Sequence, residues 1–550
     1  MKITNRFLLS LLFVLSLLPL FDLIHQGLPV THDGQDHVIR IANFYQNLTE
    51  GNIIPRWSSN VNYGFGHPVL MFFYPLPYYA ASFFHFLGFS LIDSTKIIFA
   101  LAYVLSGYMM YLFIKSLLNK EAGFVAAMLY LFAPYRFVDF YVRGAIGEHV
   151  AFLFPPLVLY FLLRISKKQT YWNFIGGALS IAGLILSHNA MSLMFLPLIF
   201  LFEFYLLWRS RFQKMLFFQL LGVIILGFAL SAFFWFPAIF EAKYTLRTIV
   251  TAGEYAKRFI TFSSLFGGPW SYGGSGVLSV QIGLVHIVLA VAAVISSAFL
   301  LKSKNDNRIL VVCLAFYSTL AIFMMLPASD ILWKHITLLQ SFQFPWRFLS
   351  ITVFTTAVMG AIFYSFLPKK YAYPPLFGIA LLLLIITYPF WKASDFLRQN
   401  DAYFTRIQRT TTNDTGESSP IWSIRFMEVK PKAHIEVIDG KATVKELDRN
   451  ITRHTYEIVA EAKARILENT LYFPGWLVLV DGEATSIEFQ DQKNRGLITF
   501  FVEEGRHRVD VVFTKTKLRT FADSLSVTGL IIVFLLYFVS EKKWVYGKKN

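Results

Sequence analysis

Charged residues are scarce in this chain of 550 residues. Asp, Glu, Lys and Arg make up 15% of it, against about 25% in an average soluble domain. Hydrophobic residues make up 55%. A composition this poor in charge and this rich in apolar side chains argues against a soluble globular protein.

Cysteine is nearly absent, and acidic residues are outnumbered. The single cysteine, Cys313, lies in an apolar run, so no intramolecular disulfide can form and thiol chemistry is not expected. The 50 Lys and Arg exceed the 34 Asp and Glu by 16. By itself this excess is compatible with a nucleic-acid partner, an anionic membrane surface or an asymmetric membrane topology.

Long apolar runs occupy most of the chain. Runs of about 17–25 residues can span a bilayer as helices, because a helix satisfies its own backbone hydrogen bonds in hydrocarbon. The first run follows Lys2 and Arg6 but lacks the small-residue cleavage site of a signal peptide, so we interpret it as a retained helix. Twelve spanning helices are predicted, at residues 7–24, 95–114, 121–134, 149–164, 172–187, 190–207, 216–240, 281–301, 309–327, 347–366, 375–391 and 523–540.

One further apolar stretch, 69–89, contains Pro75 and Pro77, and the distribution of charge decides its status. If it does not span, six basic clusters fall on the side of the N-terminus; if it spans, they move to the opposite side, against the positive-inside tendency. We therefore predict a re-entrant or in-plane helix at the outer face, with a spanning helix as the alternative. The clusters are Lys115/Lys120, Arg164/Lys167/Lys168, Arg209/Arg211/Lys214, Lys302/Lys304/Arg308, Lys369/Lys370 and Lys542/Lys543/Lys548/Lys549.

This topology accounts for the whole excess of positive charge, so no nucleic acid is expected as a partner. It gives three units: a transmembrane module at 1–393 with outer loops at 25–94 and 135–148, an extracytoplasmic β domain at 394–520, and a final helix with a basic tail at 521–550. Both termini would be cytoplasmic, and the chain would be a multi-pass protein of the inner or plasma membrane.

The predicted β domain has alternating apolar runs that indicate strands. They lie at 434–438, 455–460, 476–480, 497–502 and 508–513. The dipeptides Asp439-Gly440 and Asp481-Gly482 are typical of hairpin turns. A small β-sandwich is the favoured form. The polar, turn-rich stretch at 410–420 is predicted to be a mobile loop.

The first outer loop begins with two carboxylates and two imidazoles, at His32, Asp33, Asp36 and His37. They are sufficient for a general base or a partial metal site. If 32–40 is helical, Asp33, Asp36 and His37 share one face. The alternative is that Asp33 caps the helix and the histidines are interfacial. A divalent metal stays open but has less support, because no third cluster of ligands is evident.

The second outer loop places Arg136, Asp139, Arg143 and Glu148 among aromatic residues at the membrane boundary. A guanidinium offers a permanently charged, two-pronged donor that suits a phosphate. The alternative is an internal Arg–Asp pair that fixes the loop. Both readings stay open on spacing alone.

Two further polar positions lie where helices meet the outer face. His188 interrupts an apolar stretch, and Arg347 follows Trp346 at the start of a helix. Polar residues at membrane depth usually face a cavity or the interior of a bundle. His188 would bind a substrate or a neighbouring helix. Arg347 would bind a lipid phosphate or serve as an interfacial anchor.

These motifs together resemble a family of multi-spanning membrane proteins named for a 6-pyruvoyl-tetrahydropterin synthase-related domain, and more distantly the GT-C superfamily of membrane glycosyltransferases. Nothing in the chain resembles the zinc site of the soluble pterin enzyme, so the name does not indicate an activity. The motifs are 32–37, GNIIPR at 51–56, GFGHP at 64–68 with the tyrosine-rich run at 74–79, APYRFVDFYVRGAIGE at 133–148, SHN at 187–189, QFPWRF at 343–348 and YFPGW at 472–476.

The resemblance implies a mainly α, polytopic GT-C-like bundle of about 12 helices with an extracytoplasmic C-terminal β-sandwich-like domain. It also implies a catalytic carboxylate directly after the first helix, which here is Asp33, with Asp36 second. The implied donor is a sugar on a polyprenyl phosphate or diphosphate in the lipid bilayer. No acceptor motif is evident, so a glycan, lipid or protein acceptor stays open.

The leading hypothesis is therefore an inverting glycosyltransferase of the cell envelope. No cofactor is assigned to it, and a divalent metal stays open. Asp33 would deprotonate the acceptor, and Arg143 or Arg347 would hold the donor phosphate. The alternatives are a transporter of lipid-linked glycan or polysaccharide and a non-catalytic envelope-assembly protein. The candidate substrate-binding residues are His32, His37, Arg136, Arg143, Glu148, His188 and Arg347.

Overall fold

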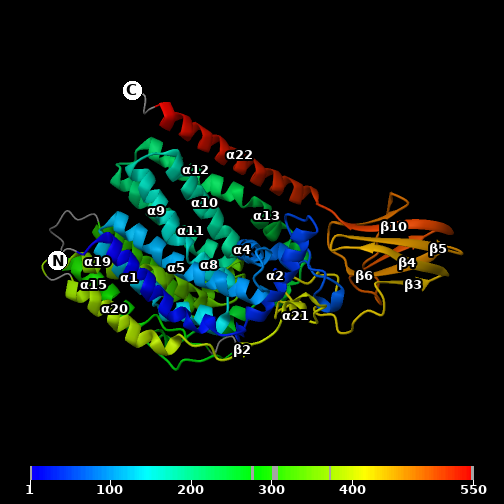
Figure 1. Ribbon diagram of the computed structural model, residues 1–550, viewed down its shortest axis with the longest axis horizontal. Helices are drawn as coiled ribbons and strands as arrows, with labels where there is room; N and C mark the ends of the chain where they lie inside the picture. Colours follow the sequence, from blue (N-terminus) through cyan, green and yellow to red (C-terminus); the bar gives the residue numbers. More distant parts are fainter. Residues whose placement is uncertain (1–2, 274–277, 300–306, 369, 371–372, 547–550) are drawn as a thin grey trace.

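The chain forms a long bundle of helices with a β domain at one end, as seen in a computed structural model (Figure 1). The structure describes residues 3–273, 278–299, 307–368, 370 and 373–546. The last helix, α22, begins at the β domain and runs back along the bundle. Six of the basic residues that fix the predicted topology lie outside the described residues: Lys2, Lys302, Lys304, Lys369, Lys548 and Lys549.

Each of the twelve apolar stretches predicted to span a membrane is largely helical within the described residues. Eight helical segments are long and apolar enough to cross a bilayer, which confirms a polytopic helical membrane protein. They are Asn5–Ile24 (α1 and η1), Leu91–Leu117 (α5), Ile146–Lys167 (α8 and α9), Asn189–Arg209 (α11), Arg308–Met325 (in α16), Pro345–Ser365 (η8 and α19), Tyr373–Phe390 (α20 and η10) and Lys517–Ser540 (in α22, Lys517–Tyr546).

The four other stretches are shorter or bent. Helix α6 (Lys120–Leu131) is followed, after a bend of 49°, by α7 and η3 (Pro134–Arg143). Helix α12 (Lys214–Leu230) meets α13 (Ala232–Phe240) at 72°. Helices α10 (Tyr171–Ser187) and α15 (Leu284–Phe299) are short apolar helices. The prediction of one continuous helix at 216–240 is therefore wrong. Residues on both sides of the break line an apolar groove together with residues of α10 and α11.

The stretch at 69–89 does not form one helix of spanning length. It is divided into α3 (Val69–Phe72) and α4 (Leu76–Phe86) around Pro75, since proline removes a backbone donor and restricts the preceding residue. Helix α4 packs on α2 (Gly34–Thr49) and α5. The division agrees with a re-entrant or in-plane element, whose side of the membrane stays a prediction.

The β domain consists of two antiparallel sheets that share one apolar core. The five-stranded sheet has the order β4-β5-β10-β7-β8, and the three-stranded sheet has the order β3-β6-β9. Asp481-Gly482 closes the β7–β8 hairpin with positive φ at both residues, as a type I′ turn requires. Asp439-Gly440 instead connects β3 and β4, which belong to different sheets, so the hairpin predicted there is wrong. The strands are β3 (Ile435–Asp439), β4 (Ala442–Arg449), β5 (Arg453–Ala460), β6 (Ala464–Leu471), β7 (Trp476–Val480), β8 (Glu483–Thr485), β9 (Leu497–Val502) and β10 (Gly505–Phe513).

Buried ion pairs fasten α22 to the bundle. Arg519 Nη2 lies 2.9 Å from Glu241 Oε2 at the end of α13, and both side chains are almost fully buried. Arg56 Nη2 lies 2.6 Å from Asp523 Oδ1. Loss of one partner of such a pair leaves an uncompensated buried charge, which costs about 3–5 kcal/mol. The first pair therefore holds the end of α13 beside α22, and the second holds the segment after α2 there.

Acid should destabilise the β domain through Glu468, which is fully buried and accepts hydrogen bonds from His454 at 2.9 Å and Arg449 at 3.2 Å. Burial alone would raise the pKa of Glu468, but His454 and Arg449 lower it from 4.5 to about 2. A lowered folded-state pKa gives stability that is present above the unfolded value and is lost as the pH falls toward 2. The shift corresponds to about 3 kcal/mol.

The ring of Trp476 packs against His454, so the difference in tryptophan fluorescence between the full chain and Trp476→Phe should report this transition between about pH 4.5 and pH 2. Glu468→Gln should be less stable at pH 7 and lose the acid-dependent step. An acid transition at the same pH in Glu468→Gln would show that another group causes it.

Candidate functional site

The N-terminus of α2 presents Asp33 without using its carboxylate as a cap. Asp33 occupies the N-cap position, but its side chain makes no capping hydrogen bond. Thr31 Oγ1 accepts from the Gly34 N–H at 3.1 Å instead. The Asp33 N–H donates to the Arg143 carbonyl at 2.8 Å. The capping alternative is therefore wrong, and the carboxylate is available to the space beside α2.

A glycine allows this close approach of the two outer loops. Gly144 has φ of +65°, and a Cβ at this position would lie 2.2 Å from Thr31 Oγ1. A larger residue would be strained in the backbone and would push the loops apart. The position of Asp33 therefore depends on the second outer loop.

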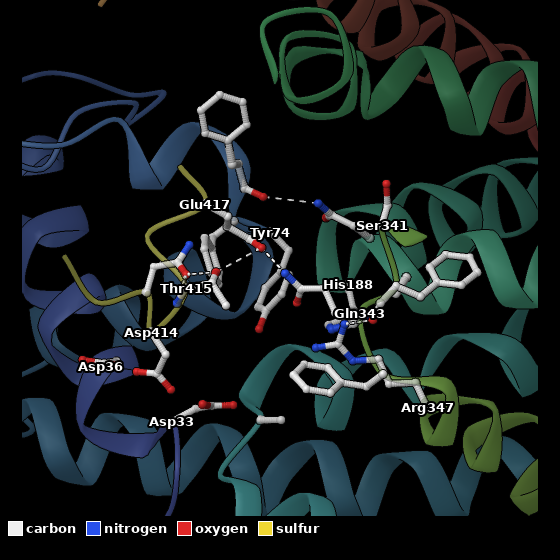
Figure 2. A pocket seen from close by; sticks show the side chains of 18 of the residues that line it. Asp33, Asp36, Tyr74, His188, Ser341, Gln343, Arg347, Asp414, Thr415 and Glu417 are labelled. Atoms are coloured by element: carbon white, nitrogen blue, oxygen red, sulfur yellow. Dashed lines mark hydrogen bonds between the residues drawn. The ribbon is translucent and has the colours of Figure 1, made fainter. Parts of the chain in front are cut away.

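A polar cavity of about 190 Å³ lies between α2, the second outer loop, the start of α11 and the segment before α19. Figure 2 shows Asp33, Asp36 and Asp414 grouped on one side and His188 and Arg347 on another. The cavity thus places Asp33, Asp36 and Asp414 on a different wall from Arg347. Its charged and imidazole-bearing lining residues are Asp33, Asp36, His37, Arg40, Arg143, His188, Arg247, Arg347, Asp414 and Glu417.

The acidic wall consists of three carboxylates that receive no hydrogen bond from a described residue: Asp33, Asp36 and Asp414. Burial raises the pKa of Asp36 to about 6, against the effect of Arg40, and Asp414 and Asp33 add to the increase. Burial likewise raises the pKa of Asp414, with Asp33 contributing. Carboxylates that take up a proton near neutral pH are suited to acid–base work.

His37 and Arg40 support this wall from α2. Arg40 Nη1 donates to His37 Nδ1 at 3.2 Å, and Arg40 Nε donates to Thr412 Oγ1 at 3.0 Å. The Arg40 guanidinium also lies 3.9 Å from the ring centre of Phe73. Burial, then Arg40, lowers the pKa of His37 well below its usual range. His37 is therefore a neutral residue that orients Arg40 rather than a base.

Arg143 borders the cavity and is held by two carboxylates. Its Nη1 donates to Asp139 at 2.6 Å and to Glu148 at 2.7 Å, and its guanidinium lies 4.6 Å from the ring centre of Trp346. Glu148 also accepts from the Tyr135 hydroxyl at 2.6 Å. The internal Arg–Asp pair considered from the sequence is therefore present, and Arg143 also lines the cavity.

Arg347 and Arg247 form no ion pair with a carboxylate in the described part of the chain. Arg347 Nη1 donates to the Phe342 carbonyl at 2.8 Å. Arg247 Nη2 donates to the Ser341 carbonyl at 3.2 Å. Both guanidinium groups keep unused donors and an uncompensated charge, which favours an anionic ligand.

Three predicted substrate-binding residues do not line the cavity. Arg136 is fully buried in the bundle, donates to Ser106 Oγ at 3.0 Å and lies 4.2 Å from the ring centre of Phe152. His32 lies at the Tyr272 carbonyl, 3.3 Å from its Nε2. Glu148 contributes to the cavity indirectly, because it accepts a hydrogen bond from Arg143, which lines it. The structure thus leaves these three outside the cavity lining, whereas it brings Asp33, Asp36, His37, Arg143, His188 and Arg347 together there.

The segment at 410–420 lines one side of the cavity, which no feature of its sequence indicates. Thr412 and Ser419 are fully buried, and Asp414 lines the cavity. The segment binds α2 through Arg40 and Thr412, and Gln343 through the hydrogen bond that Gln343 donates to Glu417. It is therefore an ordered strap between the two walls, in contrast to the mobile loop predicted.

An apolar groove of about 540 Å³ adjoins the polar cavity. The two share Asn189, Leu193, Arg247 and Ser341. Its other lining residues come mainly from α10, α11, the α12–α13 break and α18 (Thr337–Gln340). Rim residues Ile239 and Leu338 are 60% and 55% exposed. The groove is thus open along the membrane helices and ends at Arg247.

A metal site receives no support from the described residues. No group of three His, Cys, Asp or Glu side chains among them is arranged to hold a metal ion. The acidic wall supplies carboxylates, but their arrangement does not fit a metal.

Comparisons with known proteins confirm the resemblance drawn from the motifs. The profile of the 6-pyruvoyl-tetrahydropterin synthase related domain, described as a membrane protein, matches residues 70–394, more than half of the chain. An uncharacterized protein of Lactococcus lactis subsp. cremoris (strain MG1363) is 26% identical over 254 residues, which are 44% of this chain and 41% of that protein. This chain thus spans less than half the length of that relative.

Two solved structures are similar at low identity. Arabinofuranosyltransferase AftD from Mycobacteria is 15% identical with a TM-score of 0.45, over 72% of this chain and 27% of that one. The Archaeoglobus fulgidus oligosaccharyltransferase in the apo form is 14% identical with a TM-score of 0.44, over 73% of this chain and 56% of that one.

Proposed function

The chain belongs to the 6-pyruvoyl-tetrahydropterin synthase-related family of membrane proteins, and from this premise and the cavity we propose that it is a membrane glycosyltransferase. It transfers a sugar from a polyprenyl-phosphate donor to an acceptor hydroxyl on the extracytoplasmic side, with inversion. The observation that carries the proposal is one cavity in which Asp33 faces unpaired arginines and which joins an apolar groove.

The chemistry follows from the separation of charge across the cavity. Asp33 removes the proton from the acceptor hydroxyl while the oxygen of that hydroxyl forms a bond to the anomeric carbon. The bond from that carbon to the phosphate oxygen breaks, and the electron pair leaves with the phosphate. Arg347 stabilises the charge that develops on this oxygen, so no general acid is needed. Asp36, which takes up a proton near pH 6, is the second candidate for the base.

The groove supports a donor with a long apolar chain. Burial of apolar surface stabilises by about 25 cal/mol per Å², and a polyprenyl chain in the groove would bring its phosphate toward Arg247, the charged residue among the four that groove and cavity share. The sugar beyond the phosphate would then lie in the polar cavity, between Arg347 and Asp33. The donor would enter sideways from the bilayer.

The test is incubation of the purified full chain with radiolabelled polyprenyl-phosphate sugars and a panel of envelope glycans, lipids and peptides. We expect label to move from the lipid to an acceptor, with polyprenyl phosphate as the second product. Transport of the intact lipid-linked glycan across proteoliposomes, with its glycosidic bond unchanged, would instead establish a transporter. Binding of glycan without either event would indicate a non-catalytic assembly protein.

A bulky residue in the groove should weaken the binding of long-chain donors more than the binding of short-chain donors. Ala238 lines the groove and is 8% exposed, so Ala238→Trp fills part of the space that a polyprenyl chain would occupy. We expect KM for a long-chain donor to rise about tenfold, the equivalent of 1.4 kcal/mol, and KM for a short-chain donor to change little.

The matched control is Leu382→Trp, because Leu382 lies on α20 outside the groove and is 46% exposed. An equal rise in KM for long and short donors in Ala238→Trp would contradict a chain-binding role of the groove.

A further inference from the structure

His188 has one ring nitrogen occupied by the protein and one directed to the cavity. It is the N-cap residue of α11, and its Nδ1 accepts from the Met191 N–H at 3.1 Å. No described residue makes a hydrogen bond to its Nε2. The residue is 6% exposed and lines the cavity. Nε2 is not among the fully enclosed polar atoms without a partner, so it is available to a ligand in the cavity.

The cap fixes the tautomer of the imidazole. Because Nδ1 accepts a hydrogen bond, it carries no proton, so the neutral ring must carry its proton on Nε2. Burial lowers the pKa of His188 to about 3, with Glu148 opposing and Arg347 and Arg143 adding to the decrease. His188 is therefore neutral, and its Nε2–H is a donor with no acceptor among the residues that the structure describes.

The surroundings of Nε2 indicate what it binds. His188 lies beside Arg347 in the cavity (Figure 2), and its ring centre is 5.1 Å from that of Tyr74. The nearby Arg143 is occupied by Asp139 and Glu148. A donor next to an unpaired guanidinium on this side of the cavity suits an anionic oxygen, and it adds no further positive charge.

We propose that the Nε2–H of His188 donates a hydrogen bond to a phosphate oxygen of the lipid-linked donor and stabilises the leaving phosphate during transfer. This role rests on the proposed glycosyl transfer. The proton stays on Nε2 throughout: the sugar–oxygen bond breaks, the phosphate takes the electron pair, and the acceptor proton goes to Asp33. His188 is then a catalytic residue that is preorganised by the helix it caps.

Two substitutions separate the cap from the donor. In His188→Asn the amide oxygen lies near the position of Nδ1 and asparagine is a favoured N-cap, so α11 keeps its cap and the cavity loses its donor. In His188→Gln the amide nitrogen reaches toward the position of Nε2, so the donor is retained and the cap is weakened. One variant therefore keeps the helix cap and loses the Nε2 donor, and the other keeps the donor and weakens the cap.

We expect His188→Asn to melt within a few degrees of the wild type and to lower kcat about 100-fold, the effect of removing one oxyanion donor. His188→Gln should melt at a lower temperature and retain more activity than His188→Asn. Wild-type kcat in His188→Asn, or a kcat in His188→Gln no higher than in His188→Asn, would overturn the proposal and leave His188 as a helix cap.

A binding measurement distinguishes failure of this role from failure of the proposed function. Tritiated polyprenyl monophosphate in detergent micelles should bind His188→Asn about tenfold more weakly than the wild type, since a hydrogen bond to a charged group contributes at least this much. If the wild type transfers no sugar but this difference is found, the phosphate site stands and the transferase does not. Equal affinity of the two proteins would overturn the phosphate site even if sugar transfer is observed.

Discussion

Asp33→Asn should abolish sugar transfer while the protein keeps its expression level and melting temperature. Asparagine has nearly the same shape, and it can occupy the N-cap position of α2, where the Asp33 carboxylate makes no hydrogen bond. It cannot accept the proton of the acceptor hydroxyl. Proton transfer to a positioned base contributes about 10²–10⁴ in rate, and we expect kcat to fall by that factor, measured as release of labelled sugar from the donor.

Asp93→Asn is the matched control. Asp93 lies in the first turn of α5, its side chain is 54% exposed, and it is no part of the cavity. The Asp93→Asn variant should transfer sugar at the wild-type rate. If Asp33→Asn transfers sugar as well as the wild type, Asp33 is not the base, and Asp36 on the same helix becomes the residue to test.

The acidic face of α2 could be predicted because it depends on local geometry alone. Residues at i, i+3 and i+4 share one face of any helix, so Asp33, Asp36 and His37 had to lie together once 32–40 was helical. The cavity contains all three. What spacing could not give is the state of each group. His37 is neutral chiefly because of its burial, which is tertiary, whereas the effect of Arg40, three positions along the same helix, is local.

The strap at 410–420 could not be predicted, because its contacts connect distant parts of the sequence. Thr412 and Arg40 are separated by 372 positions, and nothing in a polar, turn-rich segment indicates where it packs. Asp414 therefore joins Asp33 without any local signal. The position of Asp414 beside Asp33 could be predicted only from knowledge of how the segment at 410–420 packs against the first outer loop.

Arg136 and Arg143 show a second limit of the sequence. They lie seven positions apart in one aromatic loop, and both suit a phosphate by composition. A π-helical turn, η3 (Val138–Arg143), separates them and breaks the ordinary α-helical spacing. Arg136 is consequently enclosed among aromatic rings, and Arg143 lines the cavity. The direction of each side chain depends on this turn, which the composition does not encode.

Arg347→Met should reduce kcat/KM about 10²–10³-fold, because the cavity then loses a cation next to the leaving phosphate. Methionine keeps an unbranched apolar stem that can still pack on Phe344, whose ring centre lies 4.8 Å from the guanidinium. Arg347→Lys should recover only part of the loss, since an ammonium keeps the charge but not the planar fork. Transfer from a labelled polyprenyl-phosphate sugar measures both variants.

The control for Arg347 is Arg406→Met, at an exposed arginine that stacks on Tyr403 outside the cavity. It should leave transfer unchanged. Because Arg143 is held by Asp139 and Glu148, it cannot take over the phosphate without breaking a buried network, and Arg247 remains as an arginine without an ion pair among the described residues of the cavity lining. Wild-type kcat/KM in Arg347→Met, with the Arg406 variant also active, would show that the phosphate is bound elsewhere, and Arg247 at the end of the groove would be the residue to examine.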